Sequence, residues 1–353
     1  MTYAAAPGPL TSSFARLQFN KAQALCYIID DNAEQCWPVA VALQTPGAPR
    51  MSDGCGNLLP YSFDIAINGH NNFNDSEWDN GSANGRLNQA QIRSLRDRGF
   101  GLLNHGDYHG LTGNFAPLDA NDNVVRNHQY FFNKYGWVFR CGVRPNADLG
   151  YIPAFQALGY LAGTSQGSEA GFTFYPVAGQ RPIAVEALPA GFVHLGRSFN
   201  DLTTQTGEAV LTDSFAMSNA DKSATVHPIV LHGSHVPTDT FVREAMTTIA
   251  TAANDTVLVK GMHAVMGYRD TIAKALISTD TIAGNVRTIE INLNNCSPLA
   301  DRDDMSLLTG VPGATLQSVT VQGADSCTFN AATGLVNVFR ARTLTSAQGT
   351  PRS

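Results

Sequence analysis

Two short segments of the sequence carry residues of the types that bind catalytic metals. The first is an apolar run, Tyr27-Ile28-Ile29, which ends in the adjacent carboxylates Asp30 and Asp31. The second contains His105 and His109, four positions apart in a glycine-flanked stretch. One carboxylate and two imidazoles are a common ligand set for a transition metal, and they leave coordination positions for water and substrate. The other carboxylate then remains available as a base.

The pattern around these segments predicts an α/β domain. From about residue 20 to 280, strand-like apolar runs alternate with amphipathic helical patterns. Strands are expected over residues 24–29, 62–67, 100–104, 137–140, 229–232 and 256–260, and helices over 87–98, 152–158 and 238–253. Such alternation predicts a mostly parallel sheet covered by helices, and at this length a barrel-like domain.

The candidate residues lie where the expected strands end. Asp30 and Asp31 follow the first strand, His105 follows the strand at 100–104, and His232 ends the strand at 229–232. Active residues of α/β sheets and barrels gather at the carboxyl edge of the strands. Each residue alone is more often a helix cap or a turn residue, but together they predict a single site.

The pattern changes after about residue 284, where strand-like segments follow one another without a strong helical signal. One face of the segment 286–292 carries Val286, Thr288, Glu290 and Asn292, and the other carries Arg287, Ile289 and Ile291, followed by Leu293. This alternation predicts a small all-β module. We therefore expect an N-terminal extension at 1–19, a barrel domain at 20–283, a β-sandwich-like module at 284–345 and a tail at 346–353.

Composition excludes some classes of protein. Among 353 residues, 43% are hydrophobic and 15% charged, which is typical of a folded globular chain. The net charge is −6 and the basic residues are scattered, so nucleic acid is not an expected partner. No apolar stretch approaches the roughly 20 residues that cross a bilayer.

The expected location is outside the cytoplasm. The first ten residues lack the basic region and apolar core of a signal peptide. The chain is then either cytoplasmic or a secreted, periplasmic or cell-surface protein whose signal peptide is absent from this sequence. The six cysteines form no CxxC pair. Cys36 with Cys55 and Cys296 with Cys327 are possible disulfides, and free buried thiols are the alternative.

In combination, the segments resemble the motifs of the polysaccharide deacetylases, metal-dependent carbohydrate esterases of the family 4 type with a NodB domain. The family's Thr-Phe-Asp-Asp-Gly corresponds to Ile28-Ile29-Asp30-Asp31-Asn32, and its His-Ser/Thr-x-x-His to His105-Gly106-Asp107-Tyr108-His109. Its Phe-Arg-Pro-Pro-Tyr, followed by Leu-Gly-Tyr, corresponds to Phe139-Arg140-Cys141-Gly142-Val143 and Leu158-Gly159-Tyr160. Its Ile-Leu-Leu-His-Asp corresponds to Ile229-Val230-Leu231-His232-Gly233. The order and separations agree over about residues 20 to 280.

The resemblance implies a distorted (β/α) barrel of the NodB type that holds one divalent metal. Asp31, His105 and His109 would be its ligands. Zinc is expected first, with cobalt, nickel and manganese as alternatives. Such a metal lowers the pKa of its bound water and polarises the acetyl carbonyl.

The resemblance also implies roles for four neighbouring residues. Asp30 would act as the general base, and Arg140 would orient it. His232 would protonate the leaving amine or alcohol, and Leu231 would line the pocket for the acetyl methyl group. These residues complete a hydrolytic set for an amide or ester.

The sequence departs from the family pattern at several positions. Gly106 replaces the Ser or Thr of the second motif, and the Pro-Pro-Tyr of the third is absent. Arg144, just before Pro145, is a second candidate for the orienting arginine, although Arg140 fits the spacing to Leu158-Gly159-Tyr160 better. The fourth motif, Asp-Trp, has no counterpart, since neither Asp201 nor Asp213 precedes a Trp.

Aromatic and histidine residues outside the metal motifs are weaker candidates. Trp78 lies in a Gly/Asn-rich stretch, and Tyr108 lies between the two histidines of the second motif. Both are candidate substrate-binding residues, because aromatic rings stack on sugar faces. The alternative for the Trp78 stretch is a solvated loop. His235 is interpreted as a loop residue and His263 as a capping or packing residue.

The leading hypothesis is a metal-dependent hydrolase that removes acetyl groups from an acetylated oligo- or polysaccharide. The alternative is a catalytically decayed glycan-binding or cell-surface protein on the same scaffold, which the missing motif elements suggest. An iron oxygenase with two histidines and one carboxylate is the third possibility. Such enzymes usually have a double-stranded β scaffold, so it ranks last.

Overall fold

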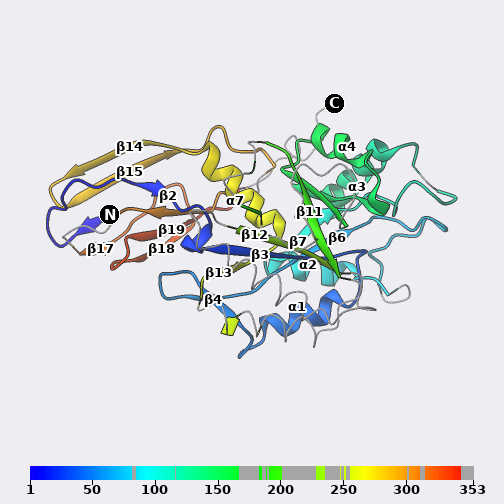
Figure 1. Ribbon diagram of the computed structural model, residues 1–353, viewed down its shortest axis with the longest axis horizontal. Coiled ribbons are helices and arrows are strands. Elements are labelled where there is room, and N and C mark those ends of the chain that lie inside the picture. Colours follow the sequence, from blue (N-terminus) through cyan, green and yellow to red (C-terminus); the bar gives the residue numbers. More distant parts are fainter. Residues whose placement is uncertain are drawn as a thin grey trace.

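The computed structural model describes most of the chain. Its described residues are 1–81, 85–115, 117–166, 183–184, 188, 191–200, 228–234, 247, 250–251, 255–299, 302–310 and 315–342. At 147, 165–166, 183–184, 197–200 and 228–234 only the backbone is described. In Figure 1 a β module lies to the left and the α/β domain to the right, with helix α7 between them.

Seven parallel strands form a sheet that closes on itself. They are β3 (Gln23–Ile29), β6 (Asp64–Ile67), β7 (Gly101–Asn104), β8 (Cys141–Val143), β9 (Ala162–Gln166), β11 (Val193–Asn200) and β12 (Pro228–Ser234). They pair in this order, and β12 pairs in turn with β3. A short parallel strand, β13 (Val257–Val259), pairs with the first half of β3, and β10 (Ile183–Ala184) runs antiparallel to β12. The predicted distorted barrel is confirmed.

Helices cover the outside of this barrel, so β3, β6 and β7 are buried along their whole length. The helices are α1 (Cys36–Gln44), α2 (Gln89–Asp97), α3 (Ala120–Tyr135), α4 (Tyr151–Ala157) and α7 (Met262–Lys274). A capping box of Asn88 and Gln91 starts α2, and Gly136 ends α3 in a left-handed conformation with φ of 62°. The helices expected at 87–98 and 152–158 are present. The one expected at 238–253 lies largely outside the described residues.

The strand expected at 137–140 is absent, and this prediction was wrong. Residues 136–140 are irregular, and strand β8 follows them at Cys141–Val143. The apolar run Trp137-Val138-Phe139 is buried, but it packs before the strand rather than within it. Consequently Arg140 precedes the strand, and Arg144 is the residue that follows its carboxyl end.

Helix α7 lies across the amino end of the barrel. His263, in its first turn, donates its backbone N–H to Asp64, the first residue of β6, at 3.0 Å. A Cβ on Gly101, the first residue of β7, would lie 2.0 Å from the His263 Nδ1. A Cβ on Gly267 would lie 2.4 Å from an Arg140 guanidinium nitrogen. The helix therefore contacts the starts of β6 and β7 and the residue before β8, and it covers this end.

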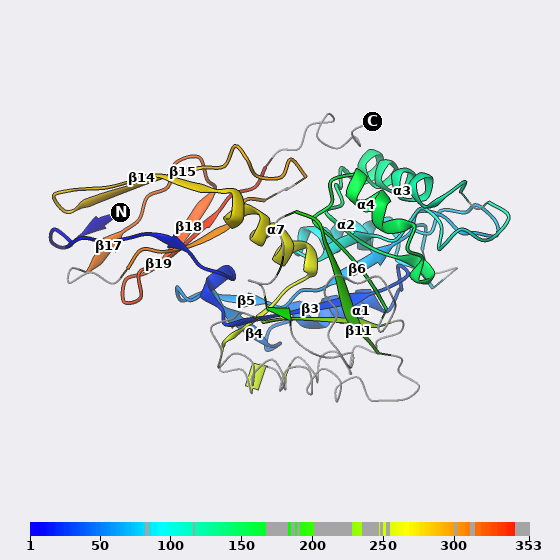
Figure 2. The same cartoon turned by 45° about the horizontal axis from the view of Figure 1, so that its top comes forward.

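The β module contains strands from both ends of the chain. One sheet has the order β14 (Leu276–Ala283), β15 (Val286–Asn292), β1 (Thr2–Tyr3) and β17 (Leu316–Ser318). The other has the order β18 (Ser326–Asn330), β19 (Leu335–Phe339), β16 (Met305–Leu308) and β2 (Ser13–Phe14). Figure 2 shows the N-terminal strands inside this module. A small hairpin of β4 (Arg50–Ser52) and β5 (Leu58–Pro60) and the short helices η1 (Gln18–Asn20) and η3 (Pro145–Ala147) complete the described elements.

The domain boundaries therefore need correction. The segment at 1–19 supplies two strands of the module, and the module begins at β14 rather than at residue 284. Strands of two residues are too short to show a period, which is why the sequence did not reveal them. The predicted alternation of β15 is present: Arg287 is fully buried and its Nε lies 2.7 Å from an Asp280 oxygen.

All six cysteines are free thiols, so neither Cys36 with Cys55 nor Cys296 with Cys327 forms a disulfide. In the part of the chain that the structure describes, no helix is both long and apolar enough to span a membrane.

Candidate metal centre

Asp31 is presented at the carboxyl end of the buried strand β3. Its φ of 68° is left-handed, a conformation that a non-glycine residue seldom adopts and that often marks a functional turn. The Arg86 guanidinium donates a hydrogen bond to the Asp31 carbonyl oxygen. Arg86 also stacks on the Trp78 ring, 3.9 Å from its centroid. The unusual backbone turn is thus supported by a side chain from a different loop.

His105 follows β7 directly and is almost completely buried, with 3% of its side chain exposed. Its Nδ1 lies 2.9 Å from the carbonyl oxygen of Val143, the last residue of β8. A carbonyl can only accept, so Nδ1 carries the hydrogen and the Nε2 of the neutral ring has a lone pair. A backbone carbonyl that fixes the tautomer in this way is typical of metal-binding histidines.

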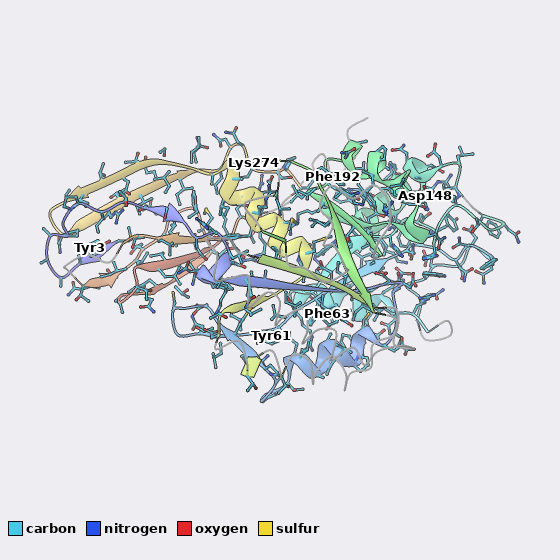
Figure 3. The ribbon with its side chains drawn as sticks, viewed as in Figure 1. Tyr3, Tyr61, Phe63, Asp148, Phe192 and Lys274 are labelled. Carbon is cyan, nitrogen blue, oxygen red and sulfur yellow. The ribbon has the colours of Figure 1, made fainter. Side chains whose placement is uncertain are left out.

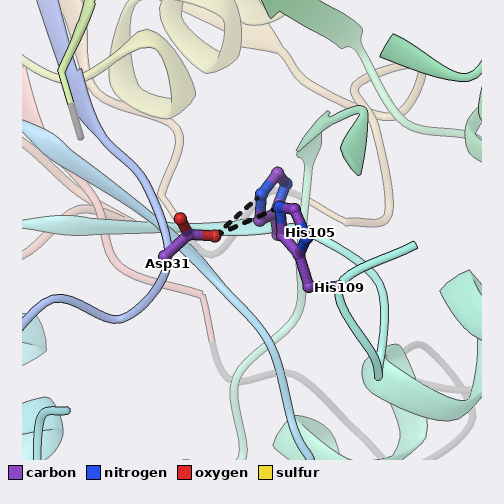
Figure 4. A group of neighbouring side chains, drawn as sticks. All are labelled: Asp31, His105 and His109. Atoms are coloured by element: carbon purple, nitrogen blue, oxygen red, sulfur yellow. Dashed lines mark ion pairs between the residues drawn. The ribbon is translucent and has the colours of Figure 1, made fainter. Parts of the chain in front are cut away.

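The three predicted ligands converge on one point (Figure 4). The Nε2 atoms of His105 and of His109 each lie 3.4 Å from the same Asp31 carboxylate oxygen. Ligand atoms of all three residues lie within 4.8 Å of one another. Ligands about 2.0–2.1 Å from a tetrahedral ion are about 3.3 Å apart. The donor set, the fixed tautomer and the spacing therefore fit a divalent metal such as zinc.

Buried amides connect the turns that carry Asp31 and His105. The Asn32 side chain donates to the Asn68 carbonyl at 2.8 Å and accepts from the Asn68 N–H at 2.6 Å. The Asn68 side chain donates in turn to the carbonyls of His105 and Gly106, at 2.6 and 2.9 Å. The carboxyl ends of β3, β6 and β7 are thereby held in fixed relative positions.

The glycine in the second motif is required by its surroundings. Gly106 has a φ of 79°, and a Cβ there would lie 2.7 Å from the Asn123 side-chain nitrogen. Asn123 accepts from the Tyr108 N–H at 2.8 Å and donates to the Tyr108 carbonyl at 2.9 Å. Side-chain amides therefore hold this loop where the family has a hydroxyl residue.

Asn72 holds the backbone of His109, the second histidine of the cluster. Its side-chain oxygen accepts from the His109 N–H at 2.9 Å, and its side-chain nitrogen donates to the His109 carbonyl at 2.9 Å. The same nitrogen donates to the Thr112 carbonyl at 2.7 Å. Asn72 itself is buried. The loop after β6 thus fixes the backbone of His109.

Asp30 is buried beside the cluster, between β3 and Asp31. Burial raises the pKa of the Cys36 thiol well above its ordinary value, and the Asp30 and Asp31 carboxylates add to the rise. In the absence of a metal, the protonated thiol is therefore the favoured form of Cys36.

The structure does not bring Arg140 to this cluster. Arg140 lies against Gly267 of α7 at the opposite end of β8. Asp303 lies in the β module, just before β16, and burial raises its pKa. The positive charges of Arg342, Arg340 and Arg140 oppose that rise, so Arg140 lies on the side of the barrel that faces the β module. Arg144 is buried after the carboxyl end of β8, next to the carbonyl that orients His105. Because β8 begins at Cys141, later than expected, Arg144 lies at the carboxyl end of the strand, where the cluster is, and Arg140 lies at its amino end.

The two aromatic candidates do not present open rings. Trp78 is 7% exposed and its face is covered by Arg86. Tyr108 is 5% exposed, and its hydroxyl donates to the Asp75 carboxylate. Burial, and then the hydrogen bond with Asp75, raise the Tyr108 pKa above its ordinary value. Both side chains brace the loops around the cluster.

Leu231 and His232 lie within β12, where the described structure is limited to the backbone. Leu231 pairs with Cys26 of β3, and His232 pairs with Tyr27 of β3 and Ser198 of β11. The strand continues to Ser234, two residues beyond the expected end. Their side chains lie outside the described residues, as do His235, Asp201 and Asp213.

Sequence reasoning missed the asparagines that hold the ligands. They are Asn32, Asn68, Asn72 and Asn123, all of them buried. The available signal was an asparagine in or near each metal-binding segment, together with Asn68 directly after a strand. Buried amides must be hydrogen-bonded, so such positions are typical of structural networks.

No protein-family model and no curated protein matches the sequence. Solved structures similar in fold include a family 4 carbohydrate esterase from Streptomyces lividans in complex with acetate. That chain is 11% identical, with a TM-score of 0.40 over 69% of this chain and 93% of the other. The chitin deacetylase of Colletotrichum lindemuthianum is 14% identical, with a TM-score of 0.33 over 68% and 82%.

A family 4 carbohydrate esterase pseudoenzyme from Bacillus anthracis is also similar. It is 8% identical, with a TM-score of 0.41 over 74% of this chain and 69% of the other. These likenesses concern the fold. The chemistry of the site rests on the contacts described above, and the barrel is not the double-stranded β scaffold of the iron oxygenases.

Proposed function

We propose that the protein is a metal-dependent deacetylase of an acetylated carbohydrate. The convergence of Asp31, His105 and His109 on one point, with the His105 tautomer fixed by a backbone carbonyl, carries the proposal. A divalent ion bound there would lower the pKa of water and polarise an acetyl carbonyl. The intact ligand set favours this function over that of a decayed binding protein.

The residues around the cluster have distinct roles in this proposal. Asp30, buried beside the ligands, accepts the proton of the attacking water as general base. Arg144 replaces Arg140 as the residue that orients Asp30, because it lies at the same end of the barrel. His232 protonates the leaving amine or alcohol, and Leu231 lines the space for the acetyl methyl group.

The cofactor and the place of action follow from the same proposal. Zinc is our first choice, since the 3.4 Å spacing between donor atoms suits tetrahedral coordination. Cobalt, nickel and manganese are the alternatives. We place the activity outside the cytoplasm, because polymeric substrates do not cross membranes; cell fractionation tests this location.

The test is release of acetate from two substrates, N-acetylated chitin oligomers and O-acetylated xylan. We expect release from at least one of them, complete loss with a chelator, and recovery on adding zinc. Asp30→Asn should reduce kcat by about 10²–10⁴-fold, because a general base contributes that much. Asp97→Asn, on an exposed carboxylate at the end of α2, is the matched control and should leave kcat unchanged.

Undiminished turnover by Asp30→Asn would contradict the proposal. So would a wild-type protein that binds these glycans but releases no acetate when zinc, cobalt, nickel and manganese are supplied in turn. In the second case the binding-protein alternative would replace it.

A further inference from the structure

Four exposed apolar side chains lie on the loops that follow β6, β7 and β8. Phe73, Phe115, Leu118 and Leu149 are 74%, 42%, 91% and 51% exposed. Phe73 lies on the loop after β6, Phe115 and Leu118 on the loop after β7, and Leu149 on the loop after β8. We call these four residues the apolar ledge. Elsewhere in the described barrel domain, Leu58 is the one comparable residue; the others lie on the β14–β15 hairpin.

The three loops that form the apolar ledge are in contact. The Phe115 N–H donates to the Asn72 carbonyl at 3.4 Å, which joins the first two loops. A Cβ on Gly150 would lie 3.5 Å from the Ala120 Cβ, which joins the third loop to the start of α3. Figure 3 shows Asp148, beside Leu149, in the half of the molecule opposite the β module. The four side chains therefore belong to one rim of the barrel.

Phe73 is held in its exposed position by a folded turn. Its N–H donates to the Asn71 side chain at 2.8 Å, and the Asp75 N–H donates to the Asn71 carbonyl at 3.1 Å. The Asn71 N–H donates to the Ser76 carbonyl at 2.9 Å. Burying a Phe side chain would stabilise the fold by removing its apolar surface from water. A ring fixed in solvent forgoes this gain, and clustered exposed apolar side chains mark interaction sites.

The same turn is joined to the metal ligands. Phe73 is adjacent in sequence to Asn72, whose side chain holds the His109 backbone through two hydrogen bonds of 2.9 Å. The His70 Nδ1 lies 2.7 Å from an Asp107 oxygen, which ties this loop to the second motif again. The loop that carries Phe73 is thus hydrogen-bonded to the segment that carries His109.

We propose that the apolar ledge binds the sugar chain of a polymeric substrate, with the Phe73 and Phe115 rings stacking on pyranose faces next to the unit that is deacetylated. This inference rests on the proposed function and deepens it, because it selects polymers over monomers. Beside Phe73, Asn74 Oδ1 accepts from Ser76 and Asp75 Oδ1 accepts from Tyr108, and the Asn74 Nδ2 and the second Asp75 carboxylate oxygen provide hydrogen-bonding groups for sugar hydroxyls. This mixture of rings and polar groups favours a glycan over a lipid surface.

The kinetic test compares substrates that do and do not reach the apolar ledge. The probes are 4-nitrophenyl acetate, chitin oligomers of two to six units, and acetylated xylan. For Phe73→Ala we expect KM to rise about tenfold for the hexamer and xylan, since one aromatic stacking contact is worth about 1.4 kcal/mol. KM for the dimer and the ester should not change, and kcat should be retained. Phe73→Trp should restore the low KM.

Leu58→Ala is the matched control, because Leu58 is 69% exposed but lies on β5, away from the rim. It should leave every KM unchanged. An unchanged KM for Phe73→Ala and Phe115→Ala at all oligomer lengths would overturn the inference that the apolar ledge binds the sugar chain. Acetate release by the same proteins would still support the proposed function.

Calorimetric binding of chitin hexamer and acetylated xylan distinguishes a failure of the apolar ledge from a failure of the proposed deacetylase function. If the wild type releases no acetate but binds either polymer, and Phe73→Ala binds it about tenfold more weakly, the apolar ledge stands without the deacetylase. Equal binding by both proteins, or no binding by the wild type, would overturn it. Binding to lipid vesicles by the wild type in place of both polymers would also overturn it.

Discussion

The two ends of the barrel both combine aspartate with histidine, but in opposite ways. At the amino end, the His263 Nδ1 lies 2.5 Å from the Asp64 carboxylate, and α7 covers the pair. At the carboxyl end, two Nε2 atoms share one Asp31 oxygen at 3.4 Å, and His109 keeps 30% of its side chain exposed. The first distance is that of a direct hydrogen bond, whereas the second leaves room for an ion between the donors.

The comparison shows that residue type and position at a strand end do not identify a site. Asp64 and His263 are of the right types, yet they are sealed and satisfy each other. At the carboxyl end, by contrast, the two histidine nitrogens face one Asp31 oxygen without bonding to it directly, and part of His109 is open to solvent. The first end is therefore expected to serve stability and the second to serve chemistry.

The largest expected effect is on stability at the amino end. His263→Ala leaves the buried Asp64 carboxylate without its imidazole partner, and we expect the free energy of unfolding to fall by about 3–5 kcal/mol. The folded fraction should still bind one metal. Urea denaturation and metal content of the native protein measure the two quantities. If His263→Ala lost its metal at unchanged stability, the amino end would serve metal binding and the assignment of the two ends would be wrong.

The two arginines sharpen the same contrast along one strand. Arg144→Gln should lower kcat about 10–100-fold with a small change in melting temperature, as expected for a residue that positions a catalytic group. Arg140→Gln, at the other end of β8, should lower the melting temperature and keep kcat. Each variant is the control for the other. If Arg140→Gln loses activity at unchanged stability, the original assignment from the sequence is restored.

The amide network predicts a smaller effect confined to the carboxyl end. Asn68→Ala removes the hydrogen bonds to the His105 and Gly106 carbonyls, so metal affinity should weaken about tenfold. Competition with a chelator of known affinity measures the change. Asn292→Ala, an exposed asparagine of β15, should have no effect. Equal metal affinity of Asn68→Ala and the wild type would show that this amide network does not support the metal site.

The last effect concerns pH and the amino end. Burial lowers the pKa of Lys260, just before α7, to about 8 from 10.5. Between those values the unfolded chain binds more protons, so stability should rise with pH by at most about 1.4 kcal/mol per unit. Lys260→Met should remove this rise. Denaturation of both proteins at pH 8 and pH 10 tests it, and parallel profiles would contradict it.

The sequence predicted those features that depend on local pattern. Strand β3 and the turn with Asp30 and Asp31 follow from an apolar run that ends in two carboxylates. The proposed ligands His105 and His109 follow from a later strand end of the same kind. Their convergence could be expected because parallel strands share one carboxyl edge.

Features that depend on distant contacts were missed or misplaced. Arg140 was preferred because its spacing to Leu158-Gly159-Tyr160 fits the family pattern better, and only pairing with β7 and β9 shows that β8 begins after it. Trp78 was a candidate for sugar binding, with a solvated loop as the equal alternative, and the structure places Arg86 over its ring. Strands β1 and β2 form by pairing with strands near the other end of the chain, as Thr2 does with Ser318 and Phe14 with Leu307.

Metal content per chain, by elemental analysis of wild type and His105→Ala after dialysis against zinc, tests the central claim most directly. We predict about one zinc ion per wild-type chain and none in the variant, with equal far-ultraviolet circular dichroism. His263→Ala, measured on its folded fraction, should match the wild type. A wild-type protein that takes up no zinc, cobalt, nickel or manganese, or a His105→Ala variant that keeps its metal, would contradict the account.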